Sequence, residues 1–139
     1  MPQKTIADAG LVVAYMDEDE AHHDWAVQMF LQYQHFYTCE AVLAEICARL
    51  NYLGIEPWRA VRLVNEDVLR LDFDMGTYAP RMEQLMVKYR DQPMDFADAC
   101  LVAMTERFAD SLVITLDAKD FSVYRRHERQ VVPFLAPRK

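Results

Sequence analysis

The spacing of apolar and polar residues changes several times along the chain, and these changes divide it into short strands and longer helices. Short segments are expected as strands at 4–8, 36–39, 69–74, 112–117 and 131–135. Segment 112–117 is a largely apolar run, whereas 69–74 alternates apolar and polar residues. Segments with apolar residues three or four positions apart are expected as helices, and they lie at 10–16, 22–33, 41–53, 57–68, 78–89 and 95–108. Pro133 favours an edge position for the last strand, and Gly54 is expected to end helix 41–53. Strands that alternate with helices predict an α/β sandwich around a small, mostly parallel central sheet.

The length and composition fit one packed domain covering residues 1–139. The chain is 53% hydrophobic and has three glycines, so it is rich in core-forming residues and poor in those of long flexible loops. Its longest apolar runs are shorter than the roughly 20 residues that cross a bilayer, and no secretory signal opens the chain. We therefore expect a cytoplasmic protein with no membrane contact.

The three cysteines give no sign of a disulfide framework or a zinc site. Cys39, Cys47 and Cys100 are odd in number and show no paired C-x-x-C spacing. Free cysteine is among the most often buried side chains, so all three are expected to be core thiols.

Two aspartates each stand at the end of an apolar strand candidate. Asp8 closes 4–8 and Asp117 closes 112–117. Ligands of parallel sheets gather beyond the carboxyl ends of the strands, so both side chains are expected at one edge of the sheet. A carboxylate in this position can also be an ordinary helix cap, and the sequence leaves both interpretations open.

Glu45 is unusual because its neighbours from Ala41 to Cys47 are otherwise all apolar. Such a glutamate either reaches water from a poorly exposed helix face or points into a protected cleft. The sequence does not choose between the two.

Asp95 and Asp98 begin the most apolar helix candidate, 95–108. A structural account is available, with Asp95 as the N-cap and Asp98 in the first turn, where the helix dipole favours both charges. Asp98, however, shares its face with Leu101 and Val102 and is expected to face inward. A carboxylate removed from water needs a partner.

Taken together, the acids predict a metal site. Several carboxylates in one place repel each other, and protons or a divalent cation must compensate. Ligands that are all oxygen suit Mg²⁺ or Mn²⁺. The formal net charge of −7 disfavours a nucleic-acid binder unless some of the acids are neutralised by such an ion.

Four segments in order resemble the PIN-domain family, especially the VapC-like ribonuclease toxins of type II toxin–antitoxin systems. They are IADAGLVVAYMDEDEAHHDWA, YTCEAVLAEICARL, PMDFADACLVAM and LVITLDAKDF. The resemblance spans nearly the whole chain. It implies a PIN-like sandwich, usually dimeric, that hydrolyses RNA with a divalent metal ion, and an antitoxin protein as partner.

The resemblance also assigns residues. The four acids of the family correspond to Asp8, Glu45, Asp98 and Asp117, as catalytic residues and ligands of Mg²⁺ or Mn²⁺. Secondary candidates, which cap, orient or bind water, are Asp95, Asp120 and Thr115. The family commonly has threonine or serine after the first aspartate, whereas this chain has Ala9, which removes one hydroxyl from the site.

Three arginines near the C-terminal end are expected to contact RNA phosphates. Arg125, Arg126 and Arg129 follow segment 119–124, which begins just past Asp117, and this proximity in sequence predicts that they lie beside the acids. The alternative is a solvated charged face.

Three other functions compete with that of a toxin ribonuclease. A PIN fold with weak catalysis that acts by binding another protein is favoured by Ala9 and by the negative net charge. A housekeeping RNA-processing nuclease shares the same chemistry. A phosphoacceptor receiver domain requires paired acids after the first strand and a late lysine, and the chain lacks these in the required order.

Overall fold

A computed structural model describes residues 3–138 and contains an alternating series of strands and helices. The elements are β1 (Lys4–Ala7), α1 (Ala9–Met16), α2 (His23–Gln32), β2 (Phe36–Thr38), α3 (Glu40–Tyr52), α4 (Trp58–Asn65), β3 (Leu69–Leu71), α5 (Met75–Lys88), α6 (Phe96–Arg107), β4 (Ser111–Ile114), α7 (Ala118–Val123), β5 (Arg125–Arg126), β6 (Gln130–Val131) and β7 (Phe134–Leu135). All eleven predicted elements are present, most of them shorter than expected.

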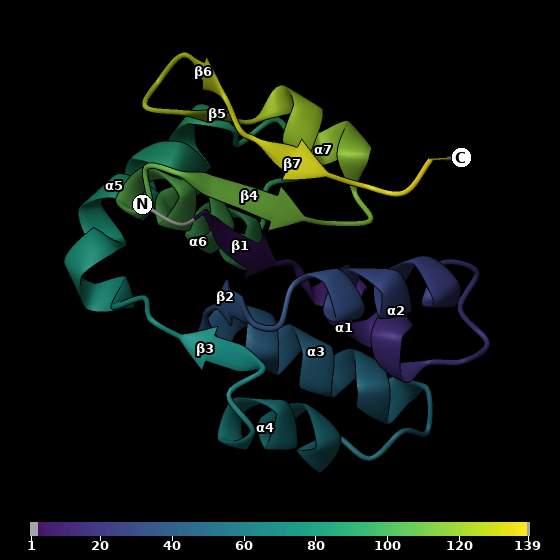
Figure 1. Cartoon of the computed structure of the whole chain (residues 1–139). Coiled ribbons are helices and arrows are strands. Elements are labelled where there is room, and N and C mark those ends of the chain that lie inside the picture. The colour runs from purple at the N-terminus through teal and green to yellow at the C-terminus, as the bar shows by residue number, and fades with distance from the viewer. Residues whose placement is uncertain (1–2, 139) are drawn as a thin grey trace.

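Five parallel strands form the central sheet, in the order β3-β2-β1-β4-β7. In Figure 1, α1, α2, α3 and α4 lie together in the lower half of the view, and α5 and α6 lie on the left. Helix α1 packs against α2 and α3, α3 also meets α6, and α5 packs against α6. The predicted α/β architecture with a small parallel sheet between helices is confirmed.

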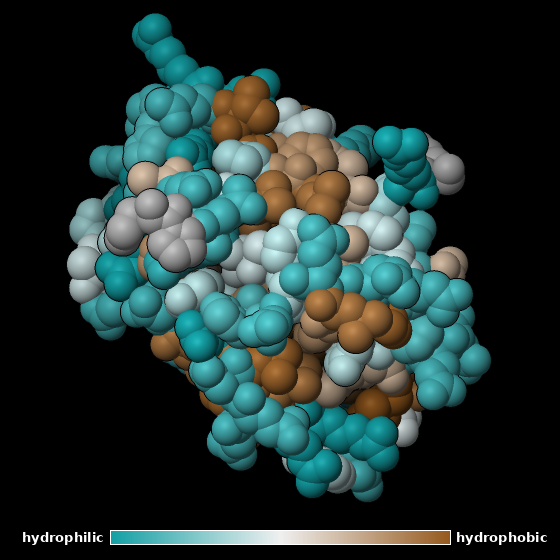
Figure 2. Space-filling model, viewed as in Figure 1, coloured by the Kyte–Doolittle hydropathy of each residue, from teal (hydrophilic) through white to brown (hydrophobic). Residues whose placement is uncertain are grey.

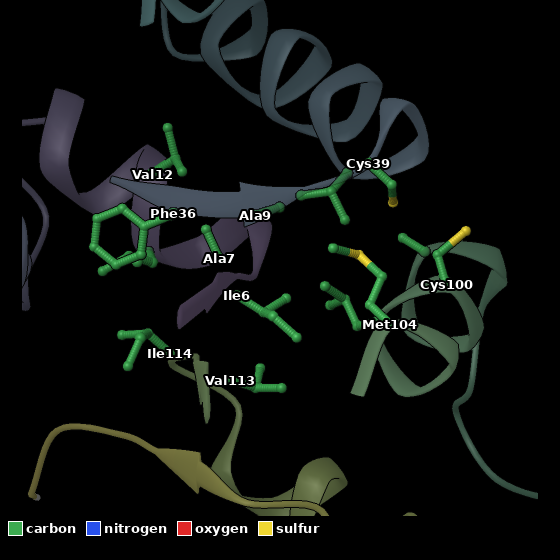
Figure 3. Packing of buried hydrophobic residues seen from close by; sticks show 14 of the residues in the cluster. Ile6, Ala7, Ala9, Val12, Phe36, Cys39, Cys100, Met104, Val113 and Ile114 are labelled. Carbon is green, nitrogen blue, oxygen red and sulfur yellow. The ribbon is translucent and has the colours of Figure 1, made fainter. Parts of the chain in front are cut away.

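The core is centred on β1 and β4. Ile6, Val113 and Ile114 are fully buried, and Figure 3 shows Ile6 between Phe36 of β2 and Met104 of α6, with Val113 and Ile114 below them in the view. Each strand of this pair is hydrogen-bonded on both sides, which explains why both read as apolar runs. Burying such side chains stabilises the fold by about 1.5–3 kcal/mol each.

The order of the strands places a crevice at the carboxyl ends of β1 and β4. These neighbours lead in opposite directions, since β1 continues toward β2 and β4 toward β7. In open parallel sheets, ligands bind at such a point of divergence. Asp8 follows β1 directly, whereas β4 ends at Ile114, three residues before Asp117.

The C-terminal part of the chain differs most from the prediction. The expected strand to Asp117 is shorter because Asp117 starts helix α7, and the antiparallel β5–β6 hairpin was not predicted. Helix α7 and the β5–β6 hairpin are both too short to show a periodic pattern of apolar residues. As expected, β7 pairs only with β4 and so lies at the edge of the sheet.

The three thiols differ in burial. Cys39 and Cys100 are buried as expected, whereas Cys47 is half-buried. Figure 2 shows a largely hydrophilic surface with apolar patches between the polar side chains. Within residues 3–138, no helix has the length and hydropathy needed to span a membrane.

Candidate active site

Six carboxylates surround one cavity of about 330 Å³. They come from the end of β1, from α3, and from the starts of α6 and α7, and they are Asp8, Glu45, Asp95, Asp98, Asp117 and Asp120. The structure therefore brings together all four acids that the sequence singled out and both acidic secondary candidates. Gly10, Arg49, Pro93 and Leu116 complete the lining.

Asp8 is held firmly at the inner side of this cavity. It is the N-cap of α1, where its Oδ1 accepts a hydrogen bond from the backbone N–H of Ala9 at 2.7 Å. The Thr115 hydroxyl donates to its Oδ2, also at 2.7 Å, and accepts from the backbone N–H of Asp117 at 2.9 Å. Burial nevertheless raises the pKa of Asp8, with a contribution from the charge of Asp117. Thr115 thus supplies the aspartate with a hydroxyl although residue 9 is alanine.

Asp98 lies in the first turn of α6, after Asp95 as N-cap. The Asp95 side chain accepts a hydrogen bond from the Asp98 backbone N–H at 2.8 Å, so the predicted capping role is confirmed. The Tyr124 hydroxyl donates to Oδ2 of Asp98 at 2.9 Å. Burial raises the pKa of Asp98 to about 7, and the charges of Asp95 and Asp8 act in the same direction against the Tyr124 hydrogen bond.

Asp117 and Asp120 belong to the first turn of α7. Asp117 is the N-cap, and its side chain accepts from the Asp120 backbone N–H at 3.2 Å. Burial, together with the neighbouring Asp117, raises the pKa of Asp120 to about 6. Of the two interpretations that the sequence left open for Asp117, the structure shows the helix cap, which also positions Asp120.

Glu45 reaches the cavity from α3, together with a cation that the sequence interpretation missed. Oε2 of Glu45 lies 3.6 Å from a guanidinium nitrogen of Arg49, one turn later. Burial and the charges of Asp8 and Asp95 raise the pKa of Glu45 in spite of this ion pair. Of the two interpretations of Glu45, the structure supports the one in which it lines a cleft.

Two further residues of the site were not predicted. Arg49 stands four residues after Glu45, and that spacing on a helix was the available signal. Tyr124 is fully buried and lies 26 residues from Asp98 in sequence, so no local pattern connects the two.

The donor set fits a hard divalent cation. Every acid around the cavity offers carboxylate oxygens, the ligands that Mg²⁺ and Mn²⁺ prefer. Within residues 3–138, however, no three His, Cys, Asp or Glu side chains converge closely enough to bind one ion directly. Five carboxylate oxygens around the cavity accept hydrogen bonds within the protein.

The three C-terminal arginines do not line the acidic cavity. The guanidinium of Arg126 donates to the carbonyls of Thr105 and Ala109, at the end of α6 away from Asp98. That of Arg125 donates to the carbonyls at the end of α7, including Ser122 at 2.8 Å. The expected proximity to the acids is wrong for Arg126 because β5 runs along α6 and leads the chain away from the cavity.

Comparison with known proteins agrees with this geometry. The model of the PIN domain family matches residues 5–126. Among solved structures, the fold is similar to that of VapC20 from Mycobacterium tuberculosis, a toxin that cleaves the sarcin-ricin loop, with a TM-score of 0.72 at 17% identity, covering 79% of this chain and 87% of that one. The chain has no match among curated proteins. With the parallel sheet, the acidic cavity and a match over most of its length, the chain belongs to the PIN-domain family.

Proposed function

We propose that this protein is an endoribonuclease that hydrolyses RNA phosphodiester bonds with Mg²⁺ or Mn²⁺. The observation that carries the proposal is the cavity lined by six carboxylates, with the pKa raised at Asp8, Glu45, Asp98 and Asp120. Such a group of acids destabilises the protein unless a cation or protons compensate, so its presence in a concave site indicates a functional role.

Asp8, Glu45, Asp98 and Asp117 are the residues that would hold the metal. The bound ion would activate water and balance the negative charge that grows on a phosphoryl oxygen. Asp95 and Asp120 would orient or bind waters at the rim, and Thr115 would fix Asp8 and the backbone N–H of Asp117. Tyr124 would hold Asp98 in one orientation through its hydroxyl.

The protonation of Asp98 depends on whether a cation is bound. Its pKa of about 7 means that both of its protonation states are populated in neutral solution while the cavity lacks a cation. A cation would favour the ionised state, because opposite charge lowers the pKa of a carboxyl group.

A toxin role is the finer part of the proposal. The likeness to VapC20 supports it, together with an RNA substrate and an antitoxin partner. A gene for a small DNA-binding protein adjacent to this one would support the pairing. Without it, a housekeeping nuclease becomes the better assignment.

A homodimer is also proposed, with a second copy covering an apolar hollow of about 420 Å³ on α5. Its lining includes Met86, Val87 and Phe96, which are 37%, 54% and 44% exposed. Contiguous apolar surface of this kind is typical of protein interfaces. Sedimentation of wild-type protein and of Val87→Glu tests the dimer.

The catalytic proposal is tested by cleavage of single-stranded RNA in Mg²⁺ and in Mn²⁺. Asp98→Asn and Glu45→Gln are expected to lower the cleavage rate at least about 100-fold, as loss of a group that stabilises the transition state commonly does. Asp91→Asn is the matched control, because Asp91 is an exposed aspartate that does not line the cavity. Wild-type protein that cleaves no RNA with either metal, or an Asp98→Asn variant as active as wild type, would contradict the proposal.

A competing function is a PIN fold that binds a protein and cleaves poorly. Ala9 and the negative net charge were the sequence features in its favour. Thr115, however, donates a hydrogen bond to Asp8 in the structure, and a bound cation would offset part of the negative charge. We therefore favour catalysis.

A further inference from the structure

A second hollow, largely apolar, adjoins the acidic cavity along α3. It has a volume of about 380 Å³ and is lined by Glu45, Ala48, Arg49, Tyr52 and Leu53. Glu45 and Arg49 line both hollows, so the two share a wall. Any chain that occupies the acidic cavity therefore has this apolar surface beside it.

Tyr52 is the most exposed large apolar side chain on this surface. It is 90% exposed, and Leu53 next to it is 45% exposed. Helix α3 ends at Tyr52, and Gly54, with φ of 77°, turns the chain away in a left-handed conformation. This turn leaves the end of α3 open, with the tyrosine ring accessible to a ligand.

Tyr52 shares one helix face with Glu45 and Arg49. Residues 45, 49 and 52 are spaced by four and three, so their side chains follow one another along α3. At about 1.5 Å per residue, Tyr52 lies roughly 10 Å from Glu45 along the helix axis. A different face of α3 meets the start of α4, where the Cys47 thiol contacts the Pro57 carbonyl oxygen at 3.7 Å.

Arg49 gives this face of α3 a positive charge at the wall that the two hollows share. It is the one cation among the described residues that line the cavity. Its ion pair with Glu45 is 3.6 Å long, and both side chains are partly exposed, at 47% and 36%. Exposed pairs of this kind contribute little to stability, so Arg49 can exchange the glutamate for a phosphate at small cost.

We propose that α3 carries a nucleotide subsite for single-stranded RNA, in which Tyr52 stacks on the base that flanks the cleaved phosphodiester and Arg49 binds the adjoining phosphate. The inference rests on the proposed ribonuclease function and identifies how an acidic protein holds its substrate. The strand must be single because only unpaired bases leave their faces free for an aromatic ring. The open tyrosine and its arginine neighbour suit this ligand because they combine a stacking surface with a cation.

Trp58 on α4 is the alternative stacking surface and provides a matched control. It is 47% exposed, and the guanidinium groups of Arg62 and Arg59 lie 4.5 Å and 5.8 Å from its ring centre. Trp58 lines neither the acidic cavity nor the adjoining hollow. Its substitution is therefore expected to leave RNA binding unchanged.

The test measures the dissociation constant of a fluorescein-labelled, mixed-sequence single-stranded RNA of about 12 nucleotides, a length within the range bound by single-strand binding domains. Ca²⁺ replaces Mg²⁺ and Mn²⁺ in the buffer, so that a divalent cation balances the acids, and recovery of intact RNA after each measurement shows that no cleavage occurred. Tyr52→Ala is expected to weaken binding about 5-fold to 100-fold, whereas Tyr52→Phe, which keeps the ring, stays near wild type. Trp58→Ala is expected to match wild type. Because Tyr52 is exposed, Tyr52→Ala should unfold at the wild-type temperature, which shows that the loss is one of binding.

Two results would overturn the inference: equal affinity of wild type and Tyr52→Ala, or a change in sedimentation of Tyr52→Ala that makes the hollow a contact between copies of the chain. These outcomes are separate from failure of the proposed function. Wild-type protein that binds the RNA through Tyr52 but does not cleave it in Mg²⁺ or Mn²⁺ would reject catalysis and leave the subsite in place. Cleavage by wild type, with RNA binding by Tyr52→Ala equal to wild type, would support catalysis and reject the subsite.

Discussion

The two ends of α6 each hold a largely buried carboxylate, and the pKa is shifted in opposite directions at the two ends. At its start, Asp98 has a tyrosine hydroxyl as its side-chain partner, and burial raises its pKa to about 7. At its end, Glu106 receives two hydrogen bonds of 2.8 Å from the guanidinium of Arg81. Burial raises the pKa of Glu106 as well, but the bonds from Arg81 and from the His127 backbone N–H outweigh it and hold the pKa below its ordinary value.

The difference shows what separates a structural acid from a reactive one in this fold. A carboxylate with a fixed guanidinium is ionised and locked in place, and Glu128 extends the pairing by accepting from Arg81 at 2.7 Å. The acids of the cavity share one cation, Arg49. Most of their negative charge is therefore left to be balanced by an ion from solution. Burial alone would not have distinguished the two groups.

The largest expected effect on stability comes from breaking the Arg81–Glu106 ion pair at the end of α6. Arg81→Met should lower the free energy of unfolding by about 3 kcal/mol or more, because it leaves the Glu106 carboxylate, 11% exposed, without a counter-charge. Urea unfolding measures the change. The double variant Arg81→Met, Glu106→Gln is the control and should recover a large part of the loss. A single variant as stable as the double would show that this pair is not what holds the end of α6.

Removing the Asp98 carboxylate at the start of α6 should increase the free energy of unfolding instead of lowering it. The pKa of Asp98 in the folded protein lies above its ordinary value of 3.8, so between about pH 4 and pH 7 the folded state holds a proton that the unfolded state releases. Metal-free wild-type protein should therefore lose stability as the pH rises through this window. Asp98→Asn should remove that loss and be about 1–2 kcal/mol more stable at pH 8, a figure reduced for partial exposure of the group.

Thermal unfolding in EDTA at several pH values measures this difference. An Asp98→Asn variant that is less stable than wild type at pH 8 would make Asp98 a structural residue of the α6 cap.

A smaller effect is expected from Tyr124→Phe. The Tyr124 hydroxyl lowers the pKa of Asp98, so its removal should raise that pKa above the wild-type value. Carbon-detected NMR titration of the aspartate side chains without metal measures the shift. Tyr89→Phe is the matched control, because the Tyr89 ring lies 5.3 Å from the Tyr124 ring and its hydroxyl binds the Arg125 backbone N–H instead. Equal titration of Asp98 in both variants would remove Tyr124 from the site.

The smallest expected effect concerns the C-terminal arginines. Replacing Arg125 and Arg126 with glutamine should leave RNA affinity and its salt dependence almost unchanged, because their guanidinium groups bind backbone carbonyls. Arg49→Gln should flatten the salt dependence, with the slope falling by about 0.7 for one lost phosphate contact on a single strand. Fluorescence anisotropy at several salt concentrations separates the two. A larger change of slope in the double variant than in Arg49→Gln would restore the arginines as the RNA-binding surface.

Much of the fold could be predicted from the sequence because the central strands and long helices carry strong apolar patterns. The run that became β4 and the segment that became α6 are examples, and both are largely buried. Helix α7, with six residues, and the two-residue strands β5 and β6 are too short for such patterns. They form because Asp117 caps one and the other two pair with each other.

The acids of the candidate site could also be predicted, whereas their partners could not. An acid among apolar residues, such as Glu45, is visible in the sequence. The contact of Asp98 with Tyr124 depends on how α6 and the residue after α7 pack together, which no local spacing records. The same limit explains the error about Arg126, since nearness in sequence to Asp117 did not mean nearness in space.

The most direct test of the central claim is the effect of Mg²⁺ and Mn²⁺ on the unfolding temperature of wild-type protein and of Asp98→Asn. A cation that binds among the acids of the folded protein stabilises it in proportion to its occupancy. The account predicts that the wild-type unfolding temperature rises with the concentration of either metal and that Asp98→Asn responds only at much higher concentrations. An equal response of the two proteins, or none in wild type, would contradict a metal site in this cavity.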